Sequence, residues 1–163
     1  MDEWNRQLLS DKARPLAADL GLLVLRLAVG VVFVAHGWGD ASQEGGAGTN
    51  VENYRGAGIP VPELSAWFGA YMQLIGGLVV LSGALTRLMS AGFIVVMTGA
   101  LVFVHRGESL VMGQDGSGSG FAFIMLAASV ALLGTGAGRF SVDRVLSNRR
   151  VRSSDRSVGV GAS

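Results

Sequence analysis

The chain has 163 residues, of which 50% are hydrophobic and only 15% charged, and its formal net charge is +1. Soluble domains carry about a quarter of charged residues, so this composition excludes an ordinary soluble domain and favours a membrane protein. Cysteine is absent, which excludes disulfides, thiolate metal sites and cysteine nucleophiles.

The chain begins with a polar segment, residues 1–18, that is predicted to lie on the cytoplasmic membrane surface. It is expected to form a short amphipathic helix, because Trp4, Leu8 and Leu9 can lie at the interface before Pro15. This segment is therefore treated as a unit of its own, ahead of a membrane domain over residues 19–146.

Four apolar segments follow, over residues 19–38, 64–85, 88–105 and 120–138. Each has about the 17–25 residues that a helix needs to cross a bilayer. The first carries one internal charge, Arg26, and the other three carry none. These lengths predict an all-α integral membrane four-helix bundle. Residues 147–163, rich in arginine and serine, are expected to form a disordered basic cytoplasmic tail.

The connections and charges predict the topology. Residues 39–63 form the longest connection, and Pro60 and Pro62 near its end prevent the next helix from starting earlier. The second connection is so short that the helices on either side must be antiparallel neighbours. Ten of the 13 Lys and Arg residues lie on the side of the termini and two on the other side. The positive-inside rule therefore predicts that both termini are cytoplasmic.

Polar residues inside the bilayer are costly and mark candidate sites. Arg26 either snorkels to the headgroups or is a buried cation, and Gln73 either bonds a neighbouring helix or belongs to a site. His36 and His105 are the two histidines of the chain, and each lies seventeen residues along a helix that runs outward. At 1.5 Å per residue both reach about the same depth, roughly 25 Å.

This matched depth leaves three interpretations of the histidine pair open. The two rings can be interfacial residues, they can exchange protons with a quinone, or they can ligate a metal or haem. Two ligands alone do not make a metal site, so no metal site is predicted and haem is disfavoured. The residues expected near the same level are Trp38, Asp40, Tyr54, Glu63, Trp67, Tyr71 and Glu108. Of these, Trp38, Asp40, Trp67 and Tyr71 are the predicted contacts with the interface or a partner.

Four sequence runs occur in a distinctive order: "LLVLRLAVGVVFVAHGWGD", "GAGIPVPELSAWF", "QLIGGLVVLSGALTRLMSAG" and "GTGAGRFSVDRVL". Together they span about residues 20–146, and the chain resembles the DoxX family of small bacterial inner-membrane proteins. The resemblance implies a four-helix membrane bundle with cytoplasmic termini. Members of the family are associated with redox and detoxification complexes, including a thiosulfate:quinone oxidoreductase subunit and an assembly containing superoxide dismutase and a sulfurtransferase.

The chain departs from the family pattern at three positions. Relatives usually carry Glu where Gln73 stands, often another Glu where Ala122 stands, and commonly Lys where Asp40 stands. The two missing carboxylates could have handled protons within the membrane. Their loss weakens the interpretation as an enzyme and favours an accessory role.

The sequence therefore favours an accessory integral-membrane subunit of a respiratory or redox-stress oxidoreductase complex in the bacterial inner membrane, linked to quinone through His36, His105, Arg26 and Gln73. The alternatives are a self-contained quinone-dependent membrane oxidoreductase and, less favoured, a small oligomeric transporter. No catalytic residue is assigned. The expected partners are the lipid bilayer and other subunits of the complex, and nucleic acid is not expected.

Overall fold

The computed structural model describes residues 3–111, 113 and 118–144. The described chain forms α1 (Glu3–Ser42), the 3-10 turn η1 (Gly46–Thr49), α2 (Asn50–Gly56), α3 (Pro62–Ser82), α4 (Thr86–Gly99), the π-helix η2 (Ala100–Val104) and α5 (Gly120–Thr135). No strand occurs in these residues, and the predicted all-α fold is confirmed. The predicted tail, residues 147–163, lies outside the described residues.

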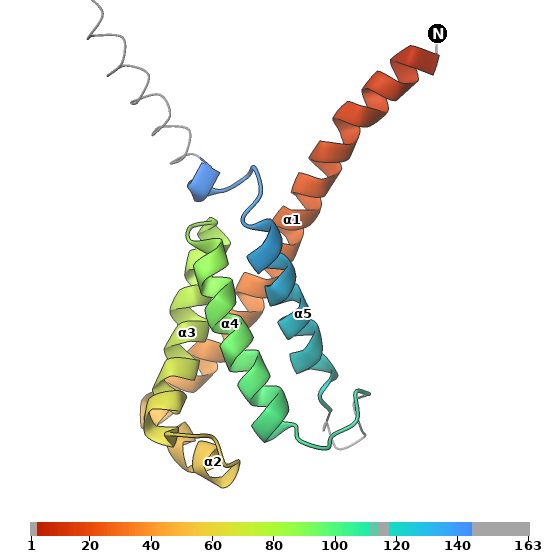
Figure 1. Ribbon diagram of the computed structural model, residues 1–163. Coiled ribbons are helices and arrows are strands. Elements are labelled where there is room, and N and C mark those ends of the chain that lie inside the picture. Colours follow the sequence, from red (N-terminus) through yellow and green to blue (C-terminus); the bar gives the residue numbers. More distant parts are fainter. Residues whose placement is uncertain (1–2, 112, 114–117, 145–163) are drawn as a thin grey trace, which may run out of the picture.

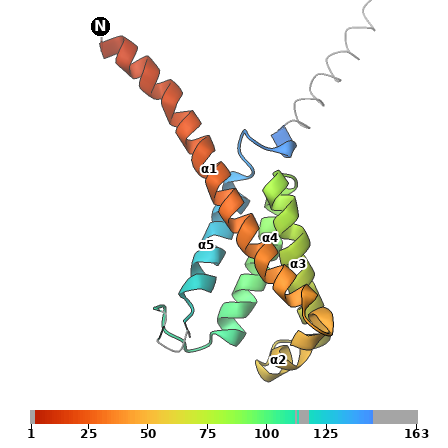
Figure 2. The ribbon, with the colours of Figure 1, turned by 180° about the vertical axis from the view of Figure 1, so that it is seen from behind.

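In the described chain, the bundle consists of α1, α3, α4 and α5, and successive members run in opposite directions (Figure 1). The long helix α1 crosses the others diagonally and packs mainly against α3, while α4 lies between α3 and α5 (Figure 2). Two connections, one with α2 and one after η2, lie at one end of the bundle. The start of α1 and the segment after α5 lie at the other end (Figure 1).

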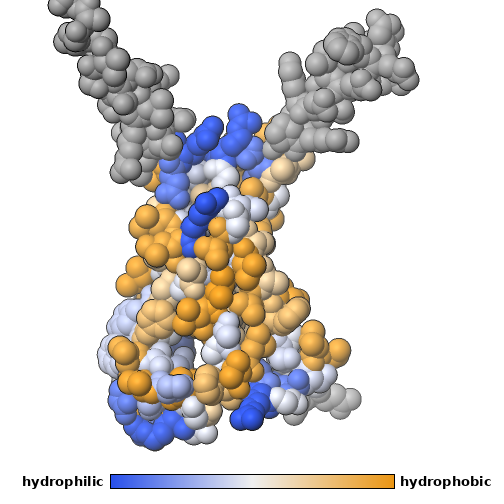
Figure 3. Space-filling view, viewed as in Figure 1, coloured by the Kyte–Doolittle hydropathy of each residue, from blue (hydrophilic) through white to orange (hydrophobic). Residues whose placement is uncertain are grey.

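The helices have the length and composition of membrane spans. Within the described residues, three segments are apolar and long enough to cross a bilayer: Leu16–Ser42, Pro62–Ser82 and Thr86–Val104. The fourth, α5, is also apolar but has only 16 residues, which is about 24 Å of helix against a hydrocarbon core of about 30 Å. Hydrophobic surface covers the middle of the molecule, and hydrophilic residues gather towards its two ends (Figure 3).

Prolines and glycines fix where the helices begin and end. Pro62 begins α3, as expected for a residue whose fixed φ suits the first helical turn. Gly83 ends α3 with φ +73°, a conformation that costs glycine nothing. Gly136 follows α5 with φ +77°. The predicted fourth segment, 120–138, therefore ends as a helix at Thr135.

The α1–α3 interface is close because glycines line it. A Cβ atom at Gly37 would lie 2.2 Å from the amide nitrogen of Leu74, and one at Gly77 would lie 2.9 Å from that of Val34. Helices in lipid gain association energy from such close backbone contact. In the centre of the bundle, the rings of Phe33 and Phe93 stack with centroids 3.8 Å apart and join α1 to α4.

The segment of residues 1–18 does not form a separate helix in the structure. Helix α1 is continuous from Glu3 to Ser42 and passes through Pro15. Its first part projects beyond the other helices (Figure 1). Whether this part lies on a membrane surface stays a prediction.

Candidate functional site

A cavity of about 530 Å³ lies at the α2 end of the bundle, within the range of small-molecule sites. Helices α1, α3, α4 and α5 contribute to its wall, together with α2 and η2. Most of the lining is apolar, and its members include Phe68, Val95, Val96, Met97, Phe103 and Phe121. The lining side chains that can form hydrogen bonds are His36, Asp40, Tyr54, Ser65, Gln73, Thr98 and His105.

His36 lies on α1 and is exposed. Its Nδ1 is 3.0 Å from the carbonyl oxygen of Val32, one turn back, and its ring stacks on Phe121 at 5.4 Å between centroids. A carbonyl oxygen can only accept a hydrogen bond, so Nδ1 carries the hydrogen. In the neutral ring the lone pair is therefore on Nε2, which can accept a proton or a hydrogen bond.

His105 follows the π-helix η2 and is half-buried. Its Nδ1 is 2.8 Å from Oε2 of Glu108, an oxygen that also accepts a hydrogen bond from the amide of Gly118 at 2.8 Å. A carboxylate accepts, so Nδ1 again carries the hydrogen and Nε2 holds the lone pair of the neutral ring. Both histidines are thus held in the same tautomer, by partners on their Nδ1 side.

The π-helix determines how His105 is positioned. The amide of His105 donates to the carbonyl of Ala100, five residues back, at 2.9 Å. This i→i−5 bond shifts the angular position of His105 relative to a regular α-helix. Such single-turn π segments occur frequently at functional sites. Regular α-helical spacing did not predict this feature.

Gln73 and Tyr54 contribute polar groups from α3 and α2. The buried Gln73 donates from Nε2 to the carbonyl of Gly69 in its own helix, at 3.1 Å. Tyr54 points its hydroxyl at Gly69, where a Cβ atom would lie 2.6 Å from the phenol oxygen. Burial raises the pKa of Tyr54, and the negative charge of Asp40 raises it further. The phenol therefore stays protonated and can donate at neutral pH.

Asp40 connects the first helix to the loop that covers the cavity. Its Oδ1 accepts a hydrogen bond from the side-chain amide of Asn50 at 2.9 Å, and its backbone carbonyl accepts one from Gln43. The bond from Asn50 fastens the start of α2, and hence Tyr54, beside the end of α1. The cavity wall on this side therefore depends on residues 39–63, for which the sequence predicts only a connection.

Of the residues predicted for a quinone or proton site, the cavity brings together His36, Gln73 and His105. Asp40, predicted as a partner contact, also lines it, and so does Ala122. All three positions at which the chain departs from the family pattern, Asp40, Gln73 and Ala122, thus line one cavity. The sequence places Glu108, the partner of His105, at the level of the histidines but does not assign it to the site, although its spacing of three residues from His105 is a usable signal.

The three aromatic residues predicted at the interface are not among the residues that line the cavity. Trp38 is 63% exposed. Trp67 and Tyr71 are also exposed and stack on each other, with ring centroids 5.7 Å apart. Their exposure at the end of the apolar surface is typical of aromatic residues at a membrane interface.

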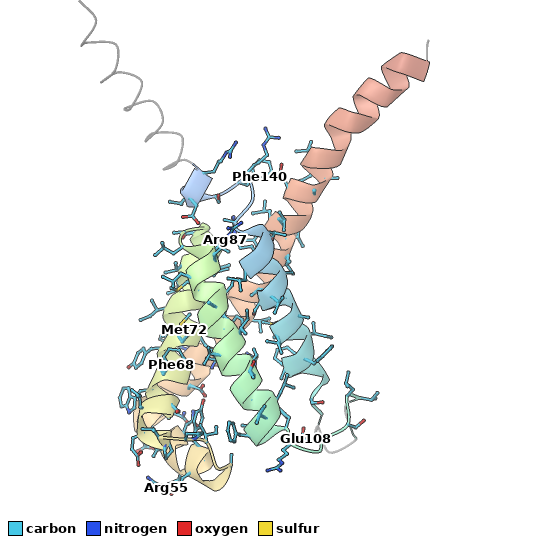
Figure 4. The ribbon with its side chains drawn as sticks, viewed as in Figure 1. Arg55, Phe68, Met72, Arg87, Glu108 and Phe140 are labelled. Carbon is cyan, nitrogen blue, oxygen red and sulfur yellow. The ribbon has the colours of Figure 1, made fainter. Side chains whose placement is uncertain are left out.

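Arg26 lies at the opposite end of the bundle from the cavity. Its side chain is buried, with 3% exposed, and does not snorkel. Nη1 donates to the carbonyl of Ala137 and Nη2 to that of Phe140, both at 2.7 Å. Phe140 lies at the top of the bundle in Figure 4, far from Glu108 and Arg55 at the bottom. The structure therefore separates Arg26 from the histidines.

The carbonyls that Arg26 binds belong to a segment that joins the middle of α1 to the turn between α3 and α4. Asp19 of α1 accepts a hydrogen bond from the amide of Arg139 at 3.2 Å. Asp143 accepts one from the amide of Leu85 at 3.0 Å and donates its own amide to the carbonyl of Gly83. Residues 137–143 thus fasten α1 to the α3–α4 turn. We refer to these contacts as the clasp.

Among the residues that the structure describes, no three His, Asp or Glu side chains gather as a group that could hold a metal ion. His36 and His105 have partners on Nδ1 as described, and their cavity neighbours are mainly apolar. The arrangement can hold a small, mostly apolar molecule and exchange hydrogen bonds or protons with its polar groups.

Comparison with known proteins gives consistent results. The family model described as DoxX matches residues 21–106. The "Inner membrane protein YqjF" of Escherichia coli is 34% identical, over 80% of this chain and 95% of its own. "Putative oxidoreductase CatD" of Bacillus subtilis is 29% identical, over 77% and 86%. "Uncharacterized membrane protein Rv3486" of Mycobacterium tuberculosis is 29% identical, over 78% and 82%. No solved structure matches the chain.

Proposed function

This chain belongs to the DoxX family of membrane proteins, and on that premise we propose that it is an accessory membrane subunit of a quinone-linked oxidoreductase complex. The observation that supports the proposal is the cavity of about 530 Å³, which combines apolar walls with His36 and His105. A quinone ring matches this lining, because its apolar faces can contact the apolar walls and its two oxygens, at opposite ends of the ring, can interact with the histidines.

The histidines suit the proton part of quinone chemistry. Reduction of a quinone to a quinol takes up two electrons and two protons. Each imidazole is held through Nδ1, so Nε2 is the atom left to bind a quinone oxygen or to pass it a proton. A ring that is fixed on one side needs little reorganisation to bind on the other.

The electrons have to come from a redox group of a partner subunit. The imidazole, carboxylate and amide groups of the cavity transfer protons and donate hydrogen bonds, and the chain has no cysteine. Gln73 and Ala122 contribute no carboxylate to the wall. An accessory role in binding quinone therefore fits these residues better than a complete catalytic centre.

The proposal includes a location in the bacterial inner membrane, with both termini in the cytoplasm. Relatives are named as membrane proteins, one of them as an inner membrane protein. Both ends of the described chain lie at the clasp end of the bundle (Figure 1), which is also the side with most Lys and Arg residues. The cavity then lies in the outer half of the membrane.

Photolabelling with a ubiquinone or menaquinone analogue in native membranes tests the proposal. We expect the analogue to label cavity residues. His36→Ala and His105→Ala should each lower its affinity about tenfold, because each variant loses one hydrogen bond to a ligand oxygen that carries partial charge. Trp38→Ala, two residues from His36 and outside the cavity lining, is the matched control. Equal labelling of all four proteins, the unmodified chain included, would contradict the proposal.

The self-contained oxidoreductase remains the second candidate, because the Bacillus subtilis relative carries an oxidoreductase name. Purification in mild detergent separates the two. An accessory subunit co-purifies with a redox partner and reduces no quinone alone. A single purified chain that reduces quinone with an added electron donor would favour the second candidate.

A further inference from the structure

A second depression, of about 450 Å³, lies at the clasp end of the bundle, between the start of α4 and the segment after α5. The residues that form it include Leu85, Arg87, Leu88, Gly136, Asp143 and Arg144. We call it the clasp groove. We propose that the clasp groove binds the headgroup of an anionic phospholipid, and this proposal is independent of the quinone site.

The charge of the groove suits a phosphodiester. Arg87 and Arg144 both line it, against the single carboxylate of Asp143. That carboxylate is engaged, because its Oδ1 accepts a hydrogen bond from the amide of Leu85 at 3.0 Å. Guanidinium groups bind phosphate oxygens through paired N–H donors and favour planar, bidentate contact.

Arg87 is held across the groove. Its Nη2 donates to the carbonyl of Gly134, at the last turn of α5, at 3.1 Å, and Figure 4 shows it between α4 and α5. This bond fixes the guanidinium in place before a ligand arrives, which lowers the entropy cost of binding.

Gly136 leaves space in the groove because it has no side chain. Gly136 has φ +77°, and a Cβ atom there would lie 3.2 Å from Nε of Arg87. Any other residue would be strained and would crowd the arginine. Gly136 belongs to the "GTGAG" run, which is no dinucleotide fingerprint because no strand–turn–helix context surrounds it. In this structure the run leaves room for a ligand beside the guanidinium of Arg87.

A lipid fits the groove better than free phosphate does. Leu85 and Leu88 line it and are 58% and 62% exposed. Leu88 lies in the first turns of Thr86–Val104, an apolar span, so the groove lies where a span leaves the hydrocarbon. A headgroup can meet the arginines there while its acyl chains continue along the leucines.

Native mass spectrometry of the detergent-solubilised full chain tests the proposal, with phosphatidylglycerol as the anionic probe and phosphatidylcholine as the neutral one. We expect one tightly bound phosphatidylglycerol. Arg87→Gln and Arg144→Gln should each weaken its binding about fivefold, the factor expected for one arginine near an anionic lipid surface. Arg144→Gln keeps the described hydrogen bond of that residue, which runs from its backbone nitrogen to Ser141.

Arg139→Gln is the matched control, because Arg139 lies at the same end, is 65% exposed and does not line the groove. It should change phosphatidylglycerol binding less than twofold. If Arg139→Gln weakened phosphatidylglycerol binding as much as the two groove variants do, the binding would depend only on the overall positive charge of this surface, and the proposal would be overturned. Equal binding of phosphatidylcholine, or displacement of the lipid by millimolar inorganic phosphate, would overturn it as well.

Discussion

At the scale of single residues, the same side chain type performs different tasks at the two ends of the bundle. Arg26 is buried and binds two backbone carbonyls, whereas Arg55 is exposed and forms ion pairs with Glu52 and Glu63. A buried arginine is tolerated where the carbonyls of a chain turn need donors. Arg26 therefore stabilises the clasp and is not part of the quinone site that we propose.

This assignment predicts the effect of removing the guanidinium. Arg26→Gln should lower the free energy of unfolding by about 3 kcal/mol, because two buried carbonyls lose their donor. Denaturant unfolding in detergent micelles measures the change. Quinone-analogue binding by the protein that remains folded should stay within twofold of the unmodified chain. A large loss of quinone-analogue binding at unchanged stability would mean that Arg26 belongs to the quinone site after all.

At the scale of elements, glycines decide how closely α1 and α3 approach, and this approach positions His36 beside the cavity. Gly37 follows His36 directly, and its Cα faces the backbone of Leu74 on α3. Gly39 lies two residues further along the same helix and has no atom within 4 Å of a Cβ position. The two glycines are thus equivalent in sequence context and different in packing.

The pair predicts opposite effects of one added methyl group. Gly37→Ala should destabilise the protein by about 1–3 kcal/mol, because the helices must separate to accept the Cβ atom. Gly39→Ala should be neutral, or stabilise by a few tenths of a kcal/mol up to about 1 kcal/mol, since alanine favours a helix over glycine. Parallel unfolding curves check both, and equal stabilities would mean that α1 and α3 do not pack closely at this depth.

At the scale of the whole molecule, alternating helix directions place both described ends on the clasp side of the bundle and the two longer connections on the cavity side (Figure 1). The clasp holds α1 and the α3–α4 turn through residues 137–143. At the other end, Glu108 joins His105 to the amide of Gly118, just before α5. The two ends thus differ. At the clasp end, hydrogen bonds to backbone carbonyls hold the segments together, whereas at the other end the segments surround the cavity that contains the histidines.

This arrangement predicts the sidedness of the protein in the membrane. Green fluorescent protein fused after the last residue should fluoresce, because that end is expected in the cytoplasm. Alkaline phosphatase fused after Gly58, in the α2 connection, should be active, because that loop is expected outside. Each reporter exchanged to the other position is the control and should be silent. The reverse pattern would invert the proposed topology and move the cavity to the cytoplasmic half.

The sequence by itself determined the class of fold, because the length of apolar segments is set by bilayer thickness and requires no tertiary contact. It also placed His36 and His105 at one depth, because the rise per residue of a helix is constant. Only the tertiary structure decided which residues share a site. The depth of a residue determines neither the direction of its side chain around the helix axis nor which helix lies beside it. The π-helix before His105 changes that direction locally. Arg26 lies ten residues before His36 on the same helix, about 15 Å along its axis, so the sequence also determined their separation. Only the tertiary structure decided that Arg26 binds the carbonyls of Ala137 and Phe140.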